Sequence, residues 1–263
     1  MSRLNTQQVF AAVREEMNAL PGHNGFYYKN LVTGEEYGVR EDEAFLAASV
    51  IKLPIYLHIL NRAAAGTIDM SEPLTATAAD KVPVCGSLTL YTGDATADIA
   101  TLCRLMISLS DNTATNLLIK RCGIDDLNAG FAAMGLRQTV LRRFLFDAEA
   151  SARGLENTVS PREMGMLLER LTRGEVVSEA VSKEAIEVLL QQQFTHKLNG
   201  KLCGLYPVAN KTGNDVGISN DVGIVYADQP FVVCFTGHEA DVYRWDDLIR
   251  RATYDLAMAV KEA

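Results

Sequence analysis

Segments with strand character lie near both ends of the chain, and the long stretch between them is patterned as helix. Short aromatic-rich runs at 25–28 and 36–39 flank a polar turn, which predicts a hairpin. Toward the other end, strand-like apolar runs at 208–212, 221–227 and 231–236 are separated by polar turns. A single sheet assembled from both ends of the chain, with the middle inserted as a mostly helical lobe, accounts for this pattern.

Apolar residues recur at helical period over most of the remaining sequence. Helices are predicted over 5–20, 49–65, 98–109, 113–121, 125–134, 161–171, 183–192 and 242–260. Residues 140–157 carry several charges with little periodicity, which predicts a long loop, and long loops inside compact domains are often functional. The expected architecture is an α/β (α+β) protein with an α/β lobe at about 1–66 and 202–263 and a helical lobe at about 67–201.

The composition is that of an ordinary globular protein. The 263 residues are 48% hydrophobic and 22% charged. A net charge of −8 argues against nucleic acid or an anionic membrane as the main partner. No stretch approaches the roughly 18 consecutive apolar residues of a membrane span, and the N-terminal residues resemble no secretory signal. We expect a monomer without nucleic-acid or membrane partners, cytoplasmic as the sequence stands, or extracytoplasmic if a leader has been removed.

The cysteines and histidines predict neither disulfides nor a metal site. The cysteines are odd in number and form no Cys-x-x-Cys pair, so reduced thiols are the default expectation. They are Cys85, Cys103, Cys122, Cys203 and Cys234. The four histidines are scattered and no His-Glu-x-x-His is present. We therefore expect no metal and no cofactor.

Ser49 and Lys52 lie three residues apart between two apolar runs. Residues at this spacing share a helix face one turn apart, so a serine that opens the helix brings its hydroxyl to the lysine amine. A lysine in apolar surroundings loses solvation, which favours its neutral form and lets it act as a base. That is one way to activate a serine without histidine. Taken alone, a helix cap followed by a surface lysine is the simpler interpretation.

Two further polar groups have simple structural interpretations when each is taken alone. Ser110-Asp111-Asn112 follows an apolar run and precedes a predicted helix, and these residue types are favoured helix caps. Lys211-Thr212-Gly213 ends a predicted strand, where a turn with an exposed lysine is ordinary. Their combination with Ser49 and Lys52 is what points to chemistry.

Together the three groups resemble the Ser-x-x-Lys, Ser-Asp-Asn and Lys-Thr-Gly motifs of class A β-lactamases and penicillin-binding proteins. The separations, 61 residues from Ser49 to Ser110 and 101 from Ser110 to Lys211, are similar to the class A pattern. The resemblance continues from Ser110 through Leu118. It implies an antiparallel sheet built from both chain ends with helices on its faces, plus an inserted helical lobe.

The resemblance also implies a role for each motif residue. Ser49 would attack a strained or terminal amide carbonyl to give an acyl-enzyme, and Lys52 would take its proton directly or through water. Ser110 would pass a proton to the departing nitrogen. Asn112 would hold the side-chain amide of the substrate, and Lys211 would stabilise negative charge.

The same resemblance implies which groups surround the reacting carbonyl. The backbone N–H groups of Ser49 and Asn214 would form the oxyanion hole. Thr212 and Gly213 would belong to the substrate-binding edge of the strand. The expected substrate is a small-molecule or peptide amide, with β-lactams as one candidate.

The sequence departs from the class A pattern at the residue that activates water for deacylation. That family carries Arg-x-Glu-x-x-Leu-Asn in a loop just before the segment matching 157–161 here. Counting two on from Arg143 gives Leu145, which cannot be a base. Asp147 or Glu149 would serve only if the loop is threaded differently. We expect an acyl-enzyme that forms but hydrolyses slowly, as in a penicillin-binding protein or DD-peptidase.

Two further departures concern substrate anchoring and cross-linking. Family members commonly hold the substrate carboxylate with an arginine on the strand after Lys-Thr-Gly, whereas this strand carries Asp221 and no arginine. Arginines of the last helix are either substitutes or part of a solvated face. The disulfide of some class A enzymes cannot form here, because the position that would pair with Cys103 is Tyr56.

Two other functions stay open at this stage. A glutaminase-like amidohydrolase shares the Ser-x-x-Lys nucleophile and a similar fold, although that group typically carries Lys-Ser-Gly on the strand. A sensor or binding module would be acylated once at Ser49 without turnover. A Ser-His-Asp hydrolase is disfavoured because no Gly-x-Ser-x-Gly is present.

Overall fold

The computed structural model describes residues 4–261, which divide into two compact units. The first unit contains the residues up to 50, residues 159–170 and the residues from 194 onward. The second contains residues 51–158 and 171–193. Each unit is therefore assembled from segments far apart in the sequence.

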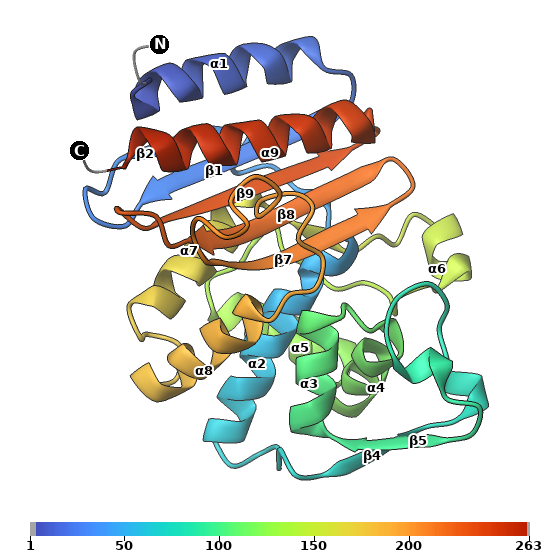
Figure 1. Ribbon diagram of the computed structural model, residues 1–263. Coiled ribbons are helices and arrows are strands. Elements are labelled where there is room, and N and C mark those ends of the chain that lie inside the picture. The colour runs from blue at the N-terminus through green and yellow to red at the C-terminus, as the bar shows by residue number, and fades with distance from the viewer. Residues whose placement is uncertain (1–3, 262–263) are drawn as a thin grey trace. The chain divides into compact units, whose positions relative to one another are not determined.

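A five-stranded antiparallel sheet with the order β2-β1-β9-β8-β7 forms the centre of the first unit (Figure 1). The pairing of β1 with β9 joins the N-terminal hairpin to the C-terminal strands, as the sequence pattern predicts. The strands are β1 (His23–Asn30), β2 (Glu36–Val39), β7 (Val208–Asp215), β8 (Ile218–Val225) and β9 (Phe231–His238). The short strand β3 (Phe45–Leu46) and the 3₁₀ turn η1 (Ala48–Ile51) follow β2 along the chain.

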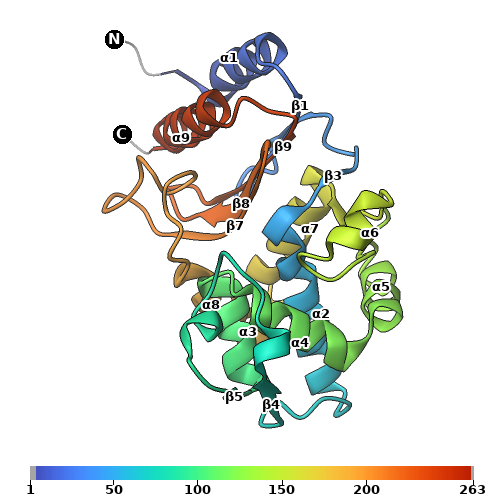
Figure 2. The ribbon, with the colours of Figure 1, turned by 90° about the vertical axis from the view of Figure 1, so that its right-hand side faces the viewer.

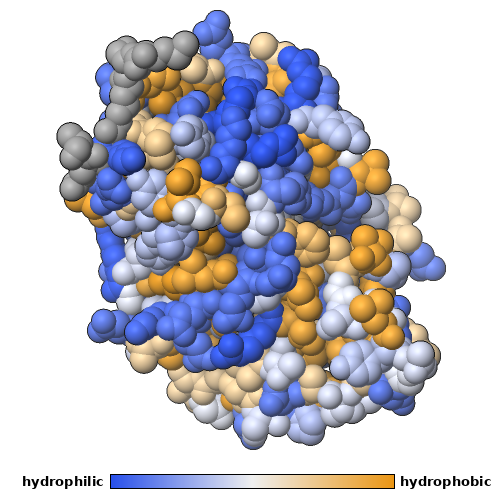
Figure 3. All heavy atoms as spheres, viewed as in Figure 1, coloured by the Kyte–Doolittle hydropathy of each residue, from blue (hydrophilic) through white to orange (hydrophobic). Residues whose placement is uncertain are grey.

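Helices cover both faces of this sheet. α1 (Thr6–Ala19) and α9 (Val242–Ala259) lie side by side on one face (Figures 1 and 2), where buried side chains such as Phe235 and Trp245 form the core. Figure 3 shows mainly hydrophilic residues over the outer face of α9, as an amphipathic helix requires. α7 (Pro161–Thr172) packs against Tyr27 on the opposite face, where a Cβ on Gly165 would lie 2.3 Å from Cδ1 of that ring.

The second unit is mainly helical, with α2 (Lys52–Ala64) in contact with α3, α4 and α5. Every residue from Lys52 to Leu60 is buried, so α2 is a core helix and not an amphipathic surface helix. The other helices are α3 (Ile99–Ser108), α4 (Asn112–Cys122), α5 (Ile124–Ala133), α6 (Ala148–Ala152) and α8 (Glu179–Leu190). The remaining elements are β4 (Pro73–Ala76), β5 (Ala95–Asp98), β6 (Thr158–Val159), η2 (Ala78–Asp80) and η3 (Leu88–Leu90).

The predicted fold class is confirmed, while strand ends differ by up to three residues and three helical segments differ from their prediction. The helix predicted from residue 49 begins as the 3₁₀ turn η1 and becomes α-helical at Lys52. The helix predicted from 183 begins at Glu179, because the Ser178 hydroxyl caps it by accepting from the amide of Val181. The predicted loop at 140–157 contains the short helix α6. None of the described helices is long and apolar enough to cross a membrane.

Candidate active site

Ser49 lies in the turn η1 of the first unit and is partly exposed. The residue before it, Ala48, has a φ of +41°, a value that non-glycine residues rarely adopt. The amide of Val50 donates to the carbonyl of Ala47 at 3.0 Å and closes the turn. The serine is thus held in a sharp, strained reversal of the backbone and not inside a regular helix.

Strand β7 approaches this turn closely at Gly213. A Cβ placed on Gly213 would lie 3.0 Å from the Ala47 carbonyl oxygen and 3.1 Å from the amide nitrogens of Ser49 and Val50. Only a glycine leaves these groups undisturbed at such distances. The amide of Asn214, the second predicted oxyanion donor, follows Gly213 directly along the strand.

Lys211 and Thr212 precede that glycine on β7, and both are buried. The Lys211 ammonium donates to the carbonyl of Thr212 at 2.7 Å. The sequence interpretation of an exposed turn lysine is therefore excluded. A buried ammonium is stable only where polar groups surround it. Charged groups held in this way are candidates for binding or catalysis.

Lys52 opens α2 in the second unit, and its ammonium is surrounded by oxygens of the Ser110–Asn112 turn. It donates to the Ser110 carbonyl at 2.7 Å, to Ser110 Oγ at 3.0 Å and to Asn112 Oδ1 at 2.8 Å. All three residues are buried, and Ser110 itself has a φ of +53°. The structure thus brings together the three predicted site residues of this unit.

The Ser49 and Lys52 positions are joined by the chain itself. Ser49 lies in η1 and Lys52 is the first residue of α2, so one uninterrupted helical segment contains both. Residues at i and i+3 eclipse one another along a 3₁₀ turn. The covalent connection therefore keeps the serine within one turn of the lysine.

Leu145 is fixed in the 140–157 loop by a side chain of α4. The Leu145 amide donates to Asn116 Oδ1 at 2.9 Å, and Asn116 Nδ2 donates to the Leu145 carbonyl at 3.0 Å. The base of the loop is held by Asn157, whose Oδ1 accepts from the amides of Arg142 and Arg143 at 2.7 and 3.1 Å. A single threading of the loop is thereby specified.

The two acidic residues of the loop have other surroundings. The carboxylate of Asp147 caps α6 by accepting from the amide of Ala150 at 2.9 Å, and Glu149 is exposed on the first turn of that helix. The ordinary helix-capping role accounts for Asp147. Neither carboxylate lies at the position that is clamped, that is, held by the two hydrogen bonds from Asn116, because Leu145 occupies it.

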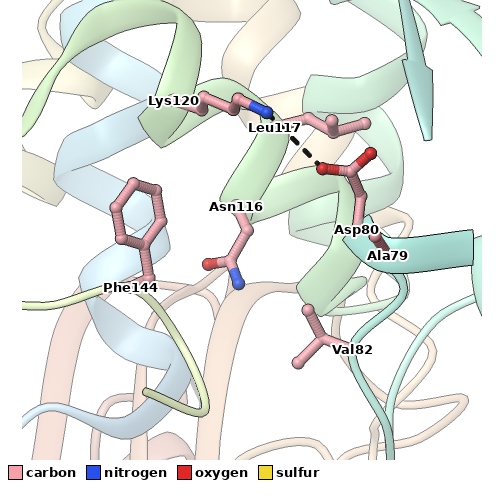
Figure 4. Close-up of a pocket in the computed structure, with 7 residues that line it drawn as sticks. All are labelled: Ala79, Asp80, Val82, Asn116, Leu117, Lys120 and Phe144. Atoms are coloured by element: carbon pink, nitrogen blue, oxygen red, sulfur yellow. Dashed lines mark ion pairs between the residues drawn. The ribbon is translucent and has the colours of Figure 1, made fainter. Parts of the chain in front are cut away.

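A cavity of about 190 Å³ lies beside this loop (Figure 4). It is lined by Ala79, Asp80, Val82, Asn116, Leu117, Lys120 and Phe144. Lys120 and Asp80 form an ion pair at 3.6 Å on its wall. Asn116 therefore both lines the cavity and binds the backbone of Leu145. The cavity is open space next to the loop.

Sequence reasoning missed Lys197, whose ammonium is fully buried in the first unit. It donates to Asn214 Oδ1 at 2.6 Å, to Ser219 Oγ at 3.0 Å and to the Asn220 carbonyl at 2.7 Å. Burial lowers the pKa of Lys197 from its ordinary value. No local motif marks this lysine, because its partners come from two strands that follow it in the chain.

Asp221 is the carboxylate on the strand where family members commonly carry an arginine. It is fully buried, accepts from Asn210 Nδ2 at 2.9 Å and from the Leu198 amide at 3.1 Å, and has its pKa raised by burial. The Asp221 carboxylate thus lies inside the first unit, where the charge of Lys197 acts on it. Among the helix α9 arginines, Arg251 pairs with Glu16 at 2.5 Å and with Asp247 at 2.7 Å, as expected of a solvated face.

The chain contains no cluster that could hold a metal within residues 4–261. No group of three or more His, Cys, Asp or Glu side chains converges there. The motif residues themselves supply hydroxyl, amine and amide groups together with backbone N–H donors.

The fold just described is that of a serine hydrolase, as the comparisons with known proteins support. The sequence profile of the Beta-lactamase enzyme family matches residues 8–259, and the chain belongs to this family. A β-lactamase of Rhodobacter capsulatus is 33% identical over 174 residues, which cover 65% of this chain and 58% of that protein.

Solved structures extend the similarity over nearly the whole chain. A β-lactamase from Sphaerobacter thermophilus is 26% identical with a TM-score of 0.87, covering 97% of this chain and 98% of that one. PBP-A is 27% identical with a TM-score of 0.87, covering 98% of both chains. PBP-A has also been solved as a leucine-to-glutamate mutant in an acyl-enzyme complex with penicillin-G.

Proposed function

We propose that this protein is a penicillin-binding acyl-transfer enzyme that is acylated at Ser49 and deacylates slowly. The observation that supports the proposal is the pair of hydrogen bonds by which Asn116 fixes Leu145, the apolar residue at the position where the resemblance to class A β-lactamases would put the base. The likeness to PBP-A supports it, since the leucine-to-glutamate mutant of that protein is described as a penicillin-G acyl-enzyme.

Acylation in this proposal uses the residues of the three sequence motifs. Once the Lys52 ammonium has released a proton to solvent, Ser49 Oγ attacks the amide carbonyl carbon, its proton passes to the Lys52 amine, and the carbon–nitrogen bond breaks. Ser110 Oγ, 3.0 Å from Lys52 Nζ, relays a proton to the departing nitrogen. The backbone amides of Ser49 and Asn214 stabilise the oxyanion, and Lys211 adds positive charge.

Deacylation needs a base that deprotonates water next to the ester. In the class A pattern this base is a glutamate two residues after an arginine of the loop, and the residue at that spacing here, Leu145, accepts no proton. General-base assistance typically contributes 10²–10⁴-fold to a rate. The ester should therefore persist long enough to be isolated.

Intact-mass spectrometry after incubation with penicillin G tests this proposal. The wild-type protein should gain the mass of one penicillin, Ser49→Ala should gain none, and Leu145→Glu should lose the adduct at least about tenfold faster than wild type. Leu155→Glu is the matched control, because it adds the same charge to the same loop at a partly exposed position. Its adduct should persist as in the wild type.

Four outcomes would contradict the proposal. Wild-type turnover of nitrocefin with a kcat of roughly 10 s⁻¹ or more would show efficient deacylation. Absence of an adduct under all conditions would remove the β-lactam substrate. Ammonia release from glutamine would identify an amidohydrolase, while permanent labelling without turnover of any peptide or β-lactam would identify a sensor.

A further inference from the structure

The backbone that carries Ser49 is strained and needs support from its surroundings. Ala48 adopts a φ of +41°, a conformation that is unfavourable for a non-glycine residue. Such a conformation persists only where neighbouring groups over-determine it. The segment Leu46–Ala47 that leads into the strained residue is therefore the place to look for that support.

Asn220, near the start of β8, supplies this support with its side chain. The carboxamide is fully buried, and Nδ2 donates to the carbonyl of Leu46 at 2.8 Å and to that of Ala47 at 3.0 Å. Oδ1 accepts from the amide of Gly237 on β9 at 2.9 Å. Both donors and the acceptor oxygen are used, so the carboxamide has one orientation that satisfies all its partners.

The register of the sheet relates this contact to the oxyanion hole. Asn220 pairs with Gly213 on β7, the glycine whose Cα lies against the Ser49 amide. The Ala47 carbonyl accepts from Asn220 Nδ2 and also from the Val50 amide, which closes the turn around Ser49. The Ala47 carbonyl thus connects β8 to the turn that contains Ser49. The position of β8 therefore affects where the hydroxyl and the amide of Ser49 lie.

We propose that Asn220 is a positioning residue for acylation, which fixes the Ser49 turn against the β7–β8 edge through Leu46 and Ala47. It acts through the backbone and touches no substrate atom. The inference rests on the proposed function, because it concerns the geometry of the same nucleophile. Loss of the two donors should let Ala48 relax, so that the Ser49 amide and hydroxyl lose their alignment with the Asn214 amide.

A merely structural role for Asn220 makes a different prediction, and Asn30 provides the matched control. Asn30 is equally buried in the same sheet, and its carboxamide also makes three hydrogen bonds, to Gln229 at 2.9 Å and from the amides of Val32 and Thr33 at 2.8 and 3.0 Å. Asn30→Ala should lower the melting temperature about as much as Asn220→Ala. It should leave the rate of acylation unchanged.

The test combines acylation kinetics with hydrogen exchange. Asn220→Ala should slow acylation by penicillin G at least about tenfold and speed exchange of the Val50 amide about tenfold, whereas Asn30→Ala should do neither. Wild-type rates and wild-type protection of Val50 in Asn220→Ala, or equal losses in Asn30→Ala, would overturn the proposal. If the wild type forms no adduct, the proposed function fails, and the Val50 exchange still decides the positioning role.

Asn220→Asp provides a second test, which can be carried out even if the alanine variant folds poorly. The aspartate keeps the shape and the acceptor for Gly237 but loses both donors to Leu46 and Ala47. Protonation at low pH restores one O–H donor. The ratio of the variant to the wild-type acylation rate should therefore rise as the pH falls from 8 to 5.5, and a constant ratio would contradict the proposed hydrogen bonds.

Discussion

Among the non-glycine residues with positive φ angles, three are a motif residue or a direct neighbour of Ser49 or Leu145. Ala48 precedes Ser49, Ser110 is itself a motif residue, and Phe146 follows Leu145. Each conformation is unfavourable in isolation and is held by hydrogen bonds of the surrounding structure, such as those from Lys52 to the carbonyl and hydroxyl of Ser110. At the scale of single residues, the site is thus a set of strained positions whose geometry depends on distant partners.

Gly213→Ala tests how closely the strand must approach the nucleophile. The new Cβ would lie 3.0–3.1 Å from the Ala47 oxygen and the Ser49 and Val50 amides, which are backbone groups and cannot swing aside. Acylation by penicillin G should slow about tenfold or more, because a shift of a few tenths of an ångström misaligns the oxyanion donors. Stopped-flow acylation rates give the measurement.

Gly93→Ala is the control for that substitution. Its added Cβ would meet no atom within 4 Å, and the backbone there is not in the left-handed region. It should acylate at the wild-type rate. Equal rates for Gly213→Ala and the wild type would show that the contact between β7 and η1 does not set the geometry of acylation.

At the scale of elements, the N-terminus of α4 connects the site to the 82–88 loop. Asp111 is buried, and its two carboxylate oxygens accept from the amides of Ala114 and Leu88, each at 2.9 Å. Asn112 adds bonds from its own amide to the Cys85 carbonyl and from Nδ2 to the Pro83 carbonyl. A helix cap and a loop anchor are combined in one turn, which carries Ser110 and Asn112.

Asp111→Ala should therefore damage stability and acylation together. Two buried N–H groups would lose their acceptor, at a cost of about 2–3 kcal/mol, or roughly 5–10 °C in melting temperature. Asp98→Ala at the start of α3 removes one cap bond, to Thr101 at 2.7 Å, and should cost about 1 kcal/mol. Scanning calorimetry and acylation rates should separate the two, with slower acylation in Asp111→Ala alone.

The β1–β9 pair carries a pH-dependent contribution to stability. Burial and the neighbouring His23 lower the pKa of His238, and Glu239 opposes this. His23 faces His238 across the strands, pairs with Glu43 at 2.8 Å and stacks on Phe45. The unfolded chain therefore takes up a proton at this histidine before the folded protein does, and stability decreases as the pH falls through about 6.5.

His238→Gln should reduce that loss of stability. Between pH 7.5 and 5.5 the melting temperature of the variant should fall by about 1–3 °C less than that of the wild type. The pKa of His196 is also lowered, chiefly by burial, so His196→Gln measures its separate contribution. Parallel melting curves for wild type and His238→Gln over this pH range would exclude the effect.

At the scale of the whole molecule, the order of helices and strands could be predicted because it follows from local periodicity. The run from Lys52 to Leu60 is apolar enough to mark a core helix, and the strands near both ends imply a shared sheet. Spaced motifs led to Ser110 and Asn112 as candidates, and the structure places both next to Lys52. Their catalytic roles are still predictions.

The supporting residues could not be predicted from the sequence, since they depend on strand register. Asn220 binds the Leu46 carbonyl, which is 174 residues away in the chain. Lys197 lies in an irregular segment and becomes a buried cation only when β7 and β8 close over it. A helix or strand pattern specifies which face of an element is buried, but the partner of a buried polar group is decided by tertiary packing.

The core, and not covalent cross-links, stabilises the whole molecule, because all five cysteines are free thiols. Burial raises the pKa of Cys103 and Cys234, and it raises that of Cys122 to about 11. The thiolate is the reactive form, so these three should react slowly in the folded protein. Cys203 is exposed and Cys85 half-buried, so these two should react first.

Thiol titration with a disulfide reagent checks this expectation. Without reductant, the denatured protein should show five thiols, the native protein should show a fast reaction that Cys203→Ser removes, and a reducing agent should shift the melting temperature by less than about 1 °C. A disulfide closing a long loop typically adds 2–4 kcal/mol, which at this size corresponds to several degrees. Fewer than five thiols, or a clear drop of the melting temperature on reduction, would show that a cross-link contributes and that the free-thiol fold is not the stable form.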